Sequence, residues 1–263
     1  VIMSFVMLVM LFIIYPRASV SAKRINEVLE TNPHMEDGTI DEDTTGIVGE
    51  VVFKNVSFKY PDAEEYILEN ISFEAKKGET VAFIGSTGSG KSTLINLIPR
   101  FYDATDGEVL VDGVDVKSMK REYLNNKLGY ISQKAVLFKG TIKSNITLGK
   151  CKDGKPSDDA IREAIRVAQA SEFVEAKEEG IDSSIAQGGT NVSGGQKQRL
   201  AIARAIARNP EIYIFDDSFS ALDYKTDFAL REDLKKYTRD ATVLIVAQRI
   251  GTIKEADKII VLD

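Results

Sequence analysis

The pattern of hydrophobic and polar positions changes near residue 50 of this chain. Downstream of that point, short apolar runs rich in Val, Ile and Phe alternate with longer segments of helical periodicity. Strands are predicted at 50–60, 67–74, 80–84, 211–215, 242–246 and 258–262, and helices at 158–179, 195–208 and 227–237. This alternation predicts an α/β fold with a mainly parallel core sheet. We also expect antiparallel strands on its N-terminal side and a helical subdomain over about 134–207.

The first fifteen residues, VIMSFVMLVMLFIIY, carry no charge. A helix that spans a bilayer needs roughly 20 apolar residues, and a signal peptide needs a basic segment before its apolar run, which is missing here. We therefore interpret the run as the end of a transmembrane helix, with a buried core helix as the alternative. The basic residues Arg17, Lys23 and Arg24 follow it and predict a cytoplasmic downstream side.

Three regions are expected along the chain. Residues 1–30 would be the end of the last transmembrane helix and its cytoplasmic extension, and residues 31–49 an acidic, turn-rich linker. Residues 50–263 would form the globular domain, which we expect to be truncated at its C-terminal end because the chain stops on a strand-like run.

Charge and composition argue against a nucleic-acid partner, an internal disulfide and a metal site with several histidines. The 263 residues include 34 Lys and Arg against 40 Asp and Glu, which gives a net charge of −6. Nucleic acid is not expected as a partner, because affinity for it comes mainly from clustered basic residues. The single cysteine, Cys151, cannot form an internal disulfide, and the single histidine, His34, excludes a site with several histidine ligands.

A glycine-rich loop carries the strongest chemical signal. Residues 85–92 read GSTGSGKS and fit the phosphate-loop pattern G-x-x-x-x-G-K-S/T, between a predicted strand and a predicted helix. Glycines let successive backbone N–H groups point at phosphate oxygens, Lys91 adds a positive charge, and the Ser92 hydroxyl can ligate Mg²⁺. The predicted nucleotide-binding residues here are Gly85, Ser86, Thr87, Gly88, Ser89, Gly90, Lys91, Ser92 and Thr93.

A second apolar strand supplies a carboxylate for the same site. The run IYIF at 212–215 is followed by Asp216 and Asp217. By itself an aspartate at a strand end is a weak signal, but beside a phosphate loop it is expected to hold Mg²⁺ directly or through water. The sequence thus predicts a P-loop NTPase core with a Mg²⁺ site at Ser92 and Asp216.

Between these two motifs lies the segment VSGGQKQR at 192–199. With this segment the chain resembles the ATP-binding cassette (ABC) proteins, whose signature is LSGGQ. The order of phosphate loop, signature and carboxylate strand is specific to that family, and the segment 137–146 resembles its exporter branch. The resemblance covers the whole chain and implies ATP and Mg²⁺ as ligands.

The resemblance also implies roles for individual residues. Tyr60 matches the aromatic residue that stacks on adenine, and Gln133 matches the glutamine that reaches Mg²⁺ and the attacking water. Asp223, in the run SALD, matches a loop that crosses to the partner subunit. The signature residues Ser193, Gly194, Gly195 and Gln196 would act in trans, on the ATP held by a second cassette. A plain helix cap is the alternative interpretation of Ser193, Gly194 and Gly195.

Two positions depart from the family pattern. Asp217 stands where the family has a glutamate that polarises water, and its carboxylate is one methylene shorter. Gln248 stands where the family has a histidine that touches the γ-phosphate, and glutamine cannot carry a proton or a positive charge. A misplacement of about 1 Å can cost about a hundredfold in rate. We therefore predict that Asp217, Gln248 and Gln133 form a catalytic group that hydrolyses ATP weakly.

On these grounds we expect the chain to be the nucleotide-binding part of an exporter subunit in a multi-pass cell-membrane protein, with the cassette in the cytoplasm. Its expected partners are its own transmembrane domain and a second half-transporter, which would carry Glu and His at the two lost positions. Two alternatives are a soluble ABC-type ATPase of DNA repair, chromosome organisation or translation, and a small-kinase phosphotransferase. The apolar start argues against the first, and the signature argues against the second.

Overall fold

The computed structural model describes residues 2–31, 35–149, 154–248 and 250–263. His34 and Cys151 therefore lie outside the described residues. The chain divides into two compact units, Val1–Glu36 and Asp37–Asp263. The second unit includes residues 37–49, which were expected to belong to a linker: Ile40 forms a parallel bridge with Met119, and the Thr45 hydroxyl donates to the Asp112 carbonyl.

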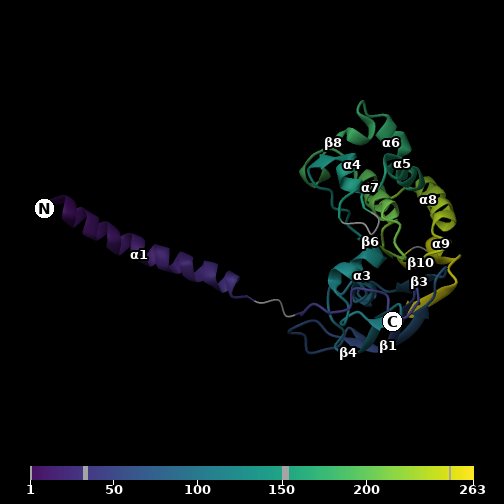
Figure 1. Cartoon of the computed structure of the whole chain (residues 1–263), viewed down its shortest axis with the longest axis horizontal. Helices are drawn as coiled ribbons and strands as arrows, with labels where there is room; N and C mark the ends of the chain where they lie inside the picture. Colours follow the sequence, from purple (N-terminus) through teal and green to yellow (C-terminus); the bar gives the residue numbers. More distant parts are fainter. Residues whose placement is uncertain (1, 32–34, 150–153, 249) are drawn as a thin grey trace. The chain divides into compact units, whose positions relative to one another are not determined.

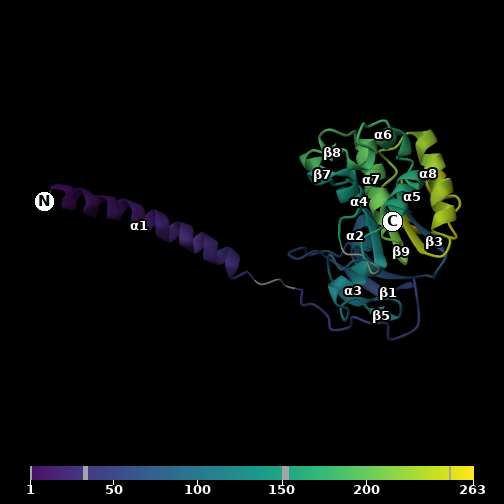
Figure 2. The ribbon, with the colours of Figure 1, turned by 45° about the horizontal axis from the view of Figure 1, so that its top comes forward.

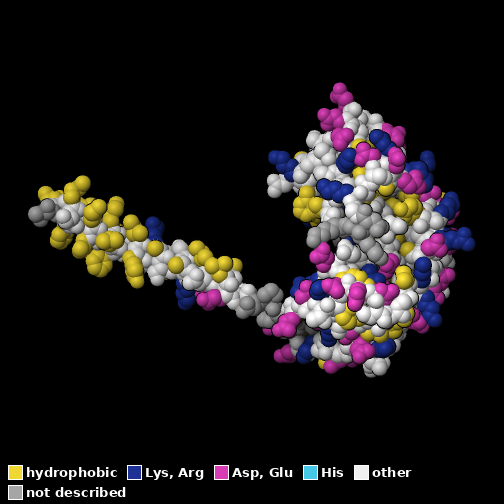
Figure 3. All heavy atoms as spheres, in the orientation of Figure 1, with side chains coloured by type: hydrophobic (Ala, Val, Ile, Leu, Met, Phe, Trp, Pro, Cys, Tyr) yellow, Lys and Arg dark blue, Asp and Glu magenta, His cyan; other side chains and the backbone are white. Residues whose placement is uncertain are grey.

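The first unit is a single long helix, α1 (Ile2–Leu29), which continues through Pro16. Its side chains are exposed along its whole length, and Figure 3 shows hydrophobic ones concentrated on its first part. By length and composition this helix could cross a membrane. The helix is longer than the uncharged run and includes the basic residues after it.

A five-stranded parallel sheet forms the centre of the second unit. Its strands, in spatial order, are β11 (Lys258–Leu262), β3 (Thr80–Gly85), β10 (Thr242–Val246), β9 (Ile212–Asp216) and β6 (Leu128–Ile131). Strands β9 and β10 are buried along their full length, as expected of a parallel sheet covered on both faces. The predicted mainly parallel core is confirmed.

The antiparallel part is a four-stranded sheet. Its strands, in spatial order, are β2 (Leu68–Ala75), β1 (Val51–Phe58), β4 (Asp106–Val111) and β5 (Val114–Asp115). Alternate residues of β1, among them Val51 and Phe53, face a core that this sheet shares with the helix after the phosphate loop. Strands β4, β5 and β6 were not predicted, because polar and glycine residues interrupt their short apolar runs.

Helices gather in the segment between β6 and β9 (Figures 1 and 2). Helix α7 is central and contacts both α4 and α5. The predicted helix over 158–179 is wrong as one element: it divides into α5 and α6, because Gln169 has φ 54°, in the left-handed region. The helices and remaining strands are α2 (Lys91–Asn96), α3 (Arg121–Lys127), β7 (Gly140–Thr141), α4 (Ile142–Ile146), α5 (Asp158–Val167), α6 (Ser171–Glu175), η1 (Gly180–Asp182), β8 (Ser184–Ile185), η2 (Gln187–Gly189), α7 (Gly194–Ala207), α8 (Tyr224–Tyr237) and α9 (Ile250–Ile253).

A buried ion-pair cluster joins the two larger sheets. The Lys127 ammonium, at the end of α3, donates to Asp112 after β4 at 2.6 Å and to Glu211 before β9 at 2.9 Å. Lys127 and Asp112 are 8% and 3% exposed. The Asp112 carboxylate also accepts the Glu50 backbone N–H at 2.9 Å, so the cluster fixes the start of β1 as well.

Replacing Lys127 by Met is expected to destabilise the protein by about 3 kcal/mol, because it leaves the buried Asp112 carboxylate without its cation. Urea denaturation measures the loss. The matched control is Lys54→Met, which removes an exposed ion pair with Glu108 and should cost less than about 1 kcal/mol. Equal costs for the two substitutions would contradict the structural role of the cluster.

Candidate functional site: a phosphate loop at the carboxyl edge of the parallel sheet

The phosphate loop connects β3 to α2, and its backbone requires glycine. Gly90 caps α2 with φ 83°, and a Cβ atom added to it would lie 2.9 Å from Leu68 Cδ2. Gly88 has φ 92°. Among the described residues, the backbone N–H groups of Thr87, Gly88 and Gly90 have no acceptor, so these donors are available to an anion.

Lys91 holds its charge inside the loop. Its ammonium donates to the Gly85 carbonyl at 2.9 Å, to the Ser86 carbonyl and to the Ser89 hydroxyl at 3.2 Å. The side chain is 8% exposed. A cation held by carbonyl oxygens in a loop of free N–H groups is suited to bind phosphate oxygens.

Two side-chain oxygen atoms that could ligate a metal ion, from separate elements, meet beside the loop. The Ser92 hydroxyl donates to Asp216 Oδ1 at 2.7 Å. Burial raises the pKa of Asp216, and hydrogen bonds from Ser92 and Tyr130 oppose this shift. A hydroxyl and a carboxylate at one point are hard oxygen ligands of the kind that Mg²⁺ takes.

The described residues contain no group of three or more His, Cys, Asp or Glu side chains that could hold a metal. The Ser92 hydroxyl and the Asp216 carboxylate would supply two oxygen ligands to a Mg²⁺ ion that takes its other ligands from water and substrate phosphates, which is how Mg²⁺ is usually bound. When bound, the ion would neutralise phosphate charge.

The three predicted catalytic residues converge on one oxygen atom. Gln133 Nε2 and Gln248 Nε2 donate to Asp217 Oδ2, at 3.1 and 3.2 Å. The sheet explains this meeting, since β9 lies between β6 and β10, and each glutamine stands two residues beyond its strand end. The Asp217 carboxylate is thus already bound to two amides; the catalytic roles of the three residues stay predictions.

The turn that carries Asp217 is fixed on both sides. Asp217 has φ 46° and is 9% exposed, and its N–H donates to the Val246 carbonyl at 3.0 Å. The buried Ser218 hydroxyl donates to the Ile131 carbonyl at 2.7 Å. This backbone position leaves little freedom to compensate for a shorter side chain.

Tyr60 lies against the phosphate-loop helix. Its hydroxyl is 3.0 Å from the Thr93 hydroxyl, and its ring makes edge contacts with Phe58 and Tyr102, with centroids 5.0 and 5.1 Å apart. The structure thus places Tyr60 and Thr93 together at the site. Adenine stacking on Tyr60 stays a prediction.

The signature residues begin α7 in a capping box. The Ser193 hydroxyl accepts the Gln196 N–H at 3.3 Å, and the Gln196 side chain accepts the Ser193 N–H at 3.0 Å. Ser193 and Gly194 are exposed, and a Cβ atom on Gly194 would meet nothing within 4 Å, whereas one on Gly195 would lie 3.3 Å from the Ala221 carbonyl.

Asp223 also caps a helix. Its carboxylate accepts the Thr226 N–H at 3.0 Å at the start of α8, and this bond lowers the pKa of the exposed Asp223 carboxyl. No hydrogen bond between described residues joins Ser193 or Asp223 to the phosphate loop. The trans role of both residues stays a prediction.

Two residues at the site were given no role from sequence. The Tyr130 hydroxyl donates to Asn96 Oδ1 at 2.9 Å and to Asp216 Oδ2 at 3.3 Å. Tyr130 stands in a short apolar run, and Asn96 at the end of α2, so neither showed a polar motif. Only their meeting beside Asp216 distinguishes them.

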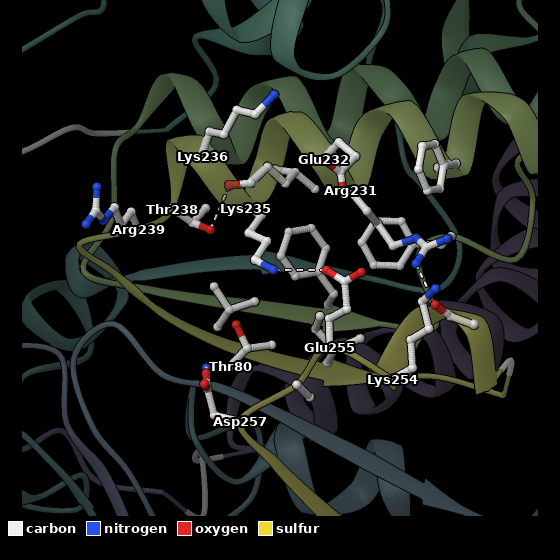
Figure 4. Close-up of a pocket in the computed structure, with 18 of the residues that line it drawn as sticks. Thr80, Arg231, Glu232, Lys235, Lys236, Thr238, Arg239, Lys254, Glu255 and Asp257 are labelled. Atoms are coloured by element: carbon white, nitrogen blue, oxygen red, sulfur yellow. Dashed lines mark hydrogen bonds and ion pairs between the residues drawn. The ribbon is translucent and has the colours of Figure 1, made fainter.

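A cavity lies away from this site. It has a volume of about 630 Å³ and is bordered by α8, the start of β3 and the segment before β11 (Figure 4). Lys235 and Glu255 form an ion pair of 2.9 Å across it, and Arg231 donates to the Gly251 carbonyl at 2.6 Å. None of the predicted site residues lines this cavity, so its size does not identify the nucleotide site.

The chain is similar to known ABC transporter proteins. A family model described as ABC transporter matches residues 68–220. An uncharacterized ABC transporter ATP-binding protein of Mycobacterium tuberculosis is 45% identical over 266 residues, covering 100% of this chain and 45% of the relative. ABC transporter B family member 13 of Arabidopsis thaliana is 41% identical over 248 residues, covering 94% of this chain and 20% of the relative.

A solved structure of a bacterial Atm1-family ABC exporter with ATP bound matches with a TM-score of 0.85 and 32% identity. The match covers 98% of this chain and 45% of that chain. The chain thus spans less than half the length of the relatives named here.

Replacing Gly90 by Ala is expected to weaken ATP binding about tenfold or more, because the left-handed backbone and the contact with Leu68 together strain the loop by about 1–3 kcal/mol. Titration with a fluorescent ATP analogue measures the affinity. Gly46→Ala is the control: Gly46 has φ 72° but no atom within 4 Å of an added Cβ. Wild-type affinity in Gly90→Ala would refute the expected role of this backbone.

Proposed function

The chain belongs to the ABC transporter family, and on that premise we propose that it is the nucleotide-binding part of an exporter subunit. It binds ATP with Mg²⁺ between the phosphate loop, Asp216 and Tyr60, and powers export by pairing head to tail with a second cassette. The observation that carries this proposal is the assembly of loop, carboxylate and two glutamines at one edge of the parallel sheet.

The region before the cassette supports a membrane location. Helix α1 is apolar enough to cross a bilayer, and Arg17, Lys23 and Arg24 follow its uncharged part, as is typical of a cytoplasmic side. Residues 1–30 are then the end of the last transmembrane helix, and residues 50–263 the cassette, with a helical subdomain at about 134–207. The apolar side chains of this helix are exposed along its length, which favours a membrane-linked protein over a soluble ATPase.

We further propose that the chain's own ATP site hydrolyses slowly. The Asp217 carboxylate is short, its backbone is fixed, and Oδ2 already accepts two amide donors. Phosphoryl transfer depends on positioning and charge stabilisation, so a base held back by about 1 Å loses about a hundredfold in rate. Gln248 supplies hydrogen bonds to this site but no positive charge.

The signature completes a competent site on a different half-transporter. The exposed Ser193 hydroxyl and the free surface around Gly194 leave room for a nucleotide held by that partner. Because the first turn of α7 presents N–H groups toward solvent, it favours an anion there. The partner carries Glu and His at the positions of Asp217 and Gln248.

The test of slow hydrolysis uses the full-length protein with its copurifying partner, whose catalytic Glu is changed to Gln. Single-turnover hydrolysis is then expected to be about a hundredfold below that of the unmodified complex. The double variant Asp217→Glu, Gln248→His should recover about tenfold or more of the lost rate. Fast turnover that survives removal of the partner's Glu, and is lost in Asp217→Ala, would contradict the proposal.

Gly194→Asp tests the trans role of the signature. It places a negative charge where the partner's phosphates would bind, so hydrolysis by the complex should fall about a hundredfold, while ATP binding by this chain persists. The control is Gly46→Asp, which adds the same charge at another open surface position. If hydrolysis by Gly194→Asp matched that of the control, the signature would not serve a second nucleotide.

A further inference from the structure

Tyr130, on β6, places its hydroxyl beside the carboxylate of Asp216, the proposed Mg²⁺ ligand. It pairs with Ile214 in the parallel register of β6 and β9, two residues before Asp216. Its hydroxyl is 2.9 Å from Asn96 Oδ1 and 3.3 Å from Asp216 Oδ2. A phenol has one proton, so the two acceptors share it, with Asn96 as the nearer one.

Both oxygens of the Asp216 carboxylate therefore have a donor from another element. Oδ1 accepts from Ser92 on α2, and Oδ2 faces the Tyr130 hydroxyl on β6. Asp216 is only 7% exposed, so water cannot easily replace a missing donor. The Ser92 hydrogen bond and the longer Tyr130 contact, on opposite oxygens, together restrict rotation of the carboxylate about its terminal bond and favour Oδ1 beside Ser92.

We propose that Tyr130 is a positioning residue for the Mg²⁺ site, whose hydroxyl holds Asp216 in the orientation that presents Oδ1 beside Ser92. The proposal rests on the proposed function of Mg²⁺-ATP binding and adds to it the residue that orients the carboxylate. Side chains that hydrogen-bond to a metal ligand commonly change metal affinity 10–100-fold when they are removed.

The ring of Tyr130 has a separate, structural task. It makes an edge contact with Phe101, with centroids 5.3 Å apart, and packs on the core between the two larger sheets. The substitution Tyr130→Phe keeps this ring and removes only the hydroxyl. A response of the metal site to that change cannot come from lost packing.

The experiment measures binding of a fluorescent ATP analogue to the full-length protein, first in EDTA and then over a range of Mg²⁺ concentrations. For Tyr130→Phe we expect the Mg²⁺ concentration at half-maximal response to rise about tenfold, with unchanged affinity in EDTA. The control is Tyr66→Phe, which also removes a hydroxyl bonded to a carboxylate, that of Asp106 at 2.8 Å, and should leave both values at wild type.

A double variant provides a second measure. With Asp216→Asn in place, adding Tyr130→Phe should cause no further change in the Mg²⁺ response, because the hydroxyl acts through that carboxylate. An unchanged Mg²⁺ requirement in Tyr130→Phe, or an equal loss of affinity with and without Mg²⁺, would overturn the positioning role. If wild-type protein bound nucleotide without any response to Mg²⁺, the proposed Mg²⁺-ATP function would fail, and the role of Tyr130 with it.

Discussion

The parallel pairing of β3, β10, β9 and β6 is the constraint on which the rest of the site depends. Parallel strands end at the same edge, so whatever follows each strand is delivered to one place. Here that edge receives the phosphate loop after β3, Gln248 after β10, Asp217 after β9 and Gln133 after β6. Because β9 lies between β6 and β10, its aspartate is flanked by a glutamine from each side. The sheet thereby brings together residues that lie far apart in the sequence: Gly85 and Gln248 are 163 positions apart.

Binding and hydrolysis make different demands on this edge. Holding a triphosphate needs backbone donors and a lysine, and these come from one continuous loop whose glycines fix its shape. Activating water needs a base at the correct distance, and that distance depends on side-chain length beyond a rigid backbone. The turn at Asp217 is tied to both neighbouring strands through Val246 and Ile131, so a side-chain change there is not absorbed by backbone movement. A single methylene can therefore separate the two functions without disturbing the fold.

Much of this arrangement could be predicted from the sequence, and there are physical reasons why the rest could not. The runs VAFI at 81–84, IYIF at 212–215 and VLIV at 243–246 contain only apolar and aromatic residues, so buried parallel strands could be recognised there. Strand β6 reads LGYI, too short and too mixed to be recognised, so the position of Gln133 rested on family resemblance alone. The break between α5 and α6 depends on a left-handed Gln169, which a helical pattern does not reveal. The bonds of Tyr130 and Asn96 depend on which strands are neighbours, which is a property of the sheet.

The order of strands in the sheet also explains why Tyr130, which belongs to no recognised sequence motif, matters at this site. Asp216 is buried, so water does not easily replace a lost hydrogen-bond donor, and each donor is costly to lose. Ser92 comes with the phosphate loop and donates to Oδ1, whereas the contact to Oδ2 comes from β6, beside β9, through the Tyr130 hydroxyl at 3.3 Å. A phenylalanine would fill the same space and leave Oδ2 without a donor. The order of strands in the sheet thus places the Tyr130 hydroxyl where it can orient the carboxylate beside it.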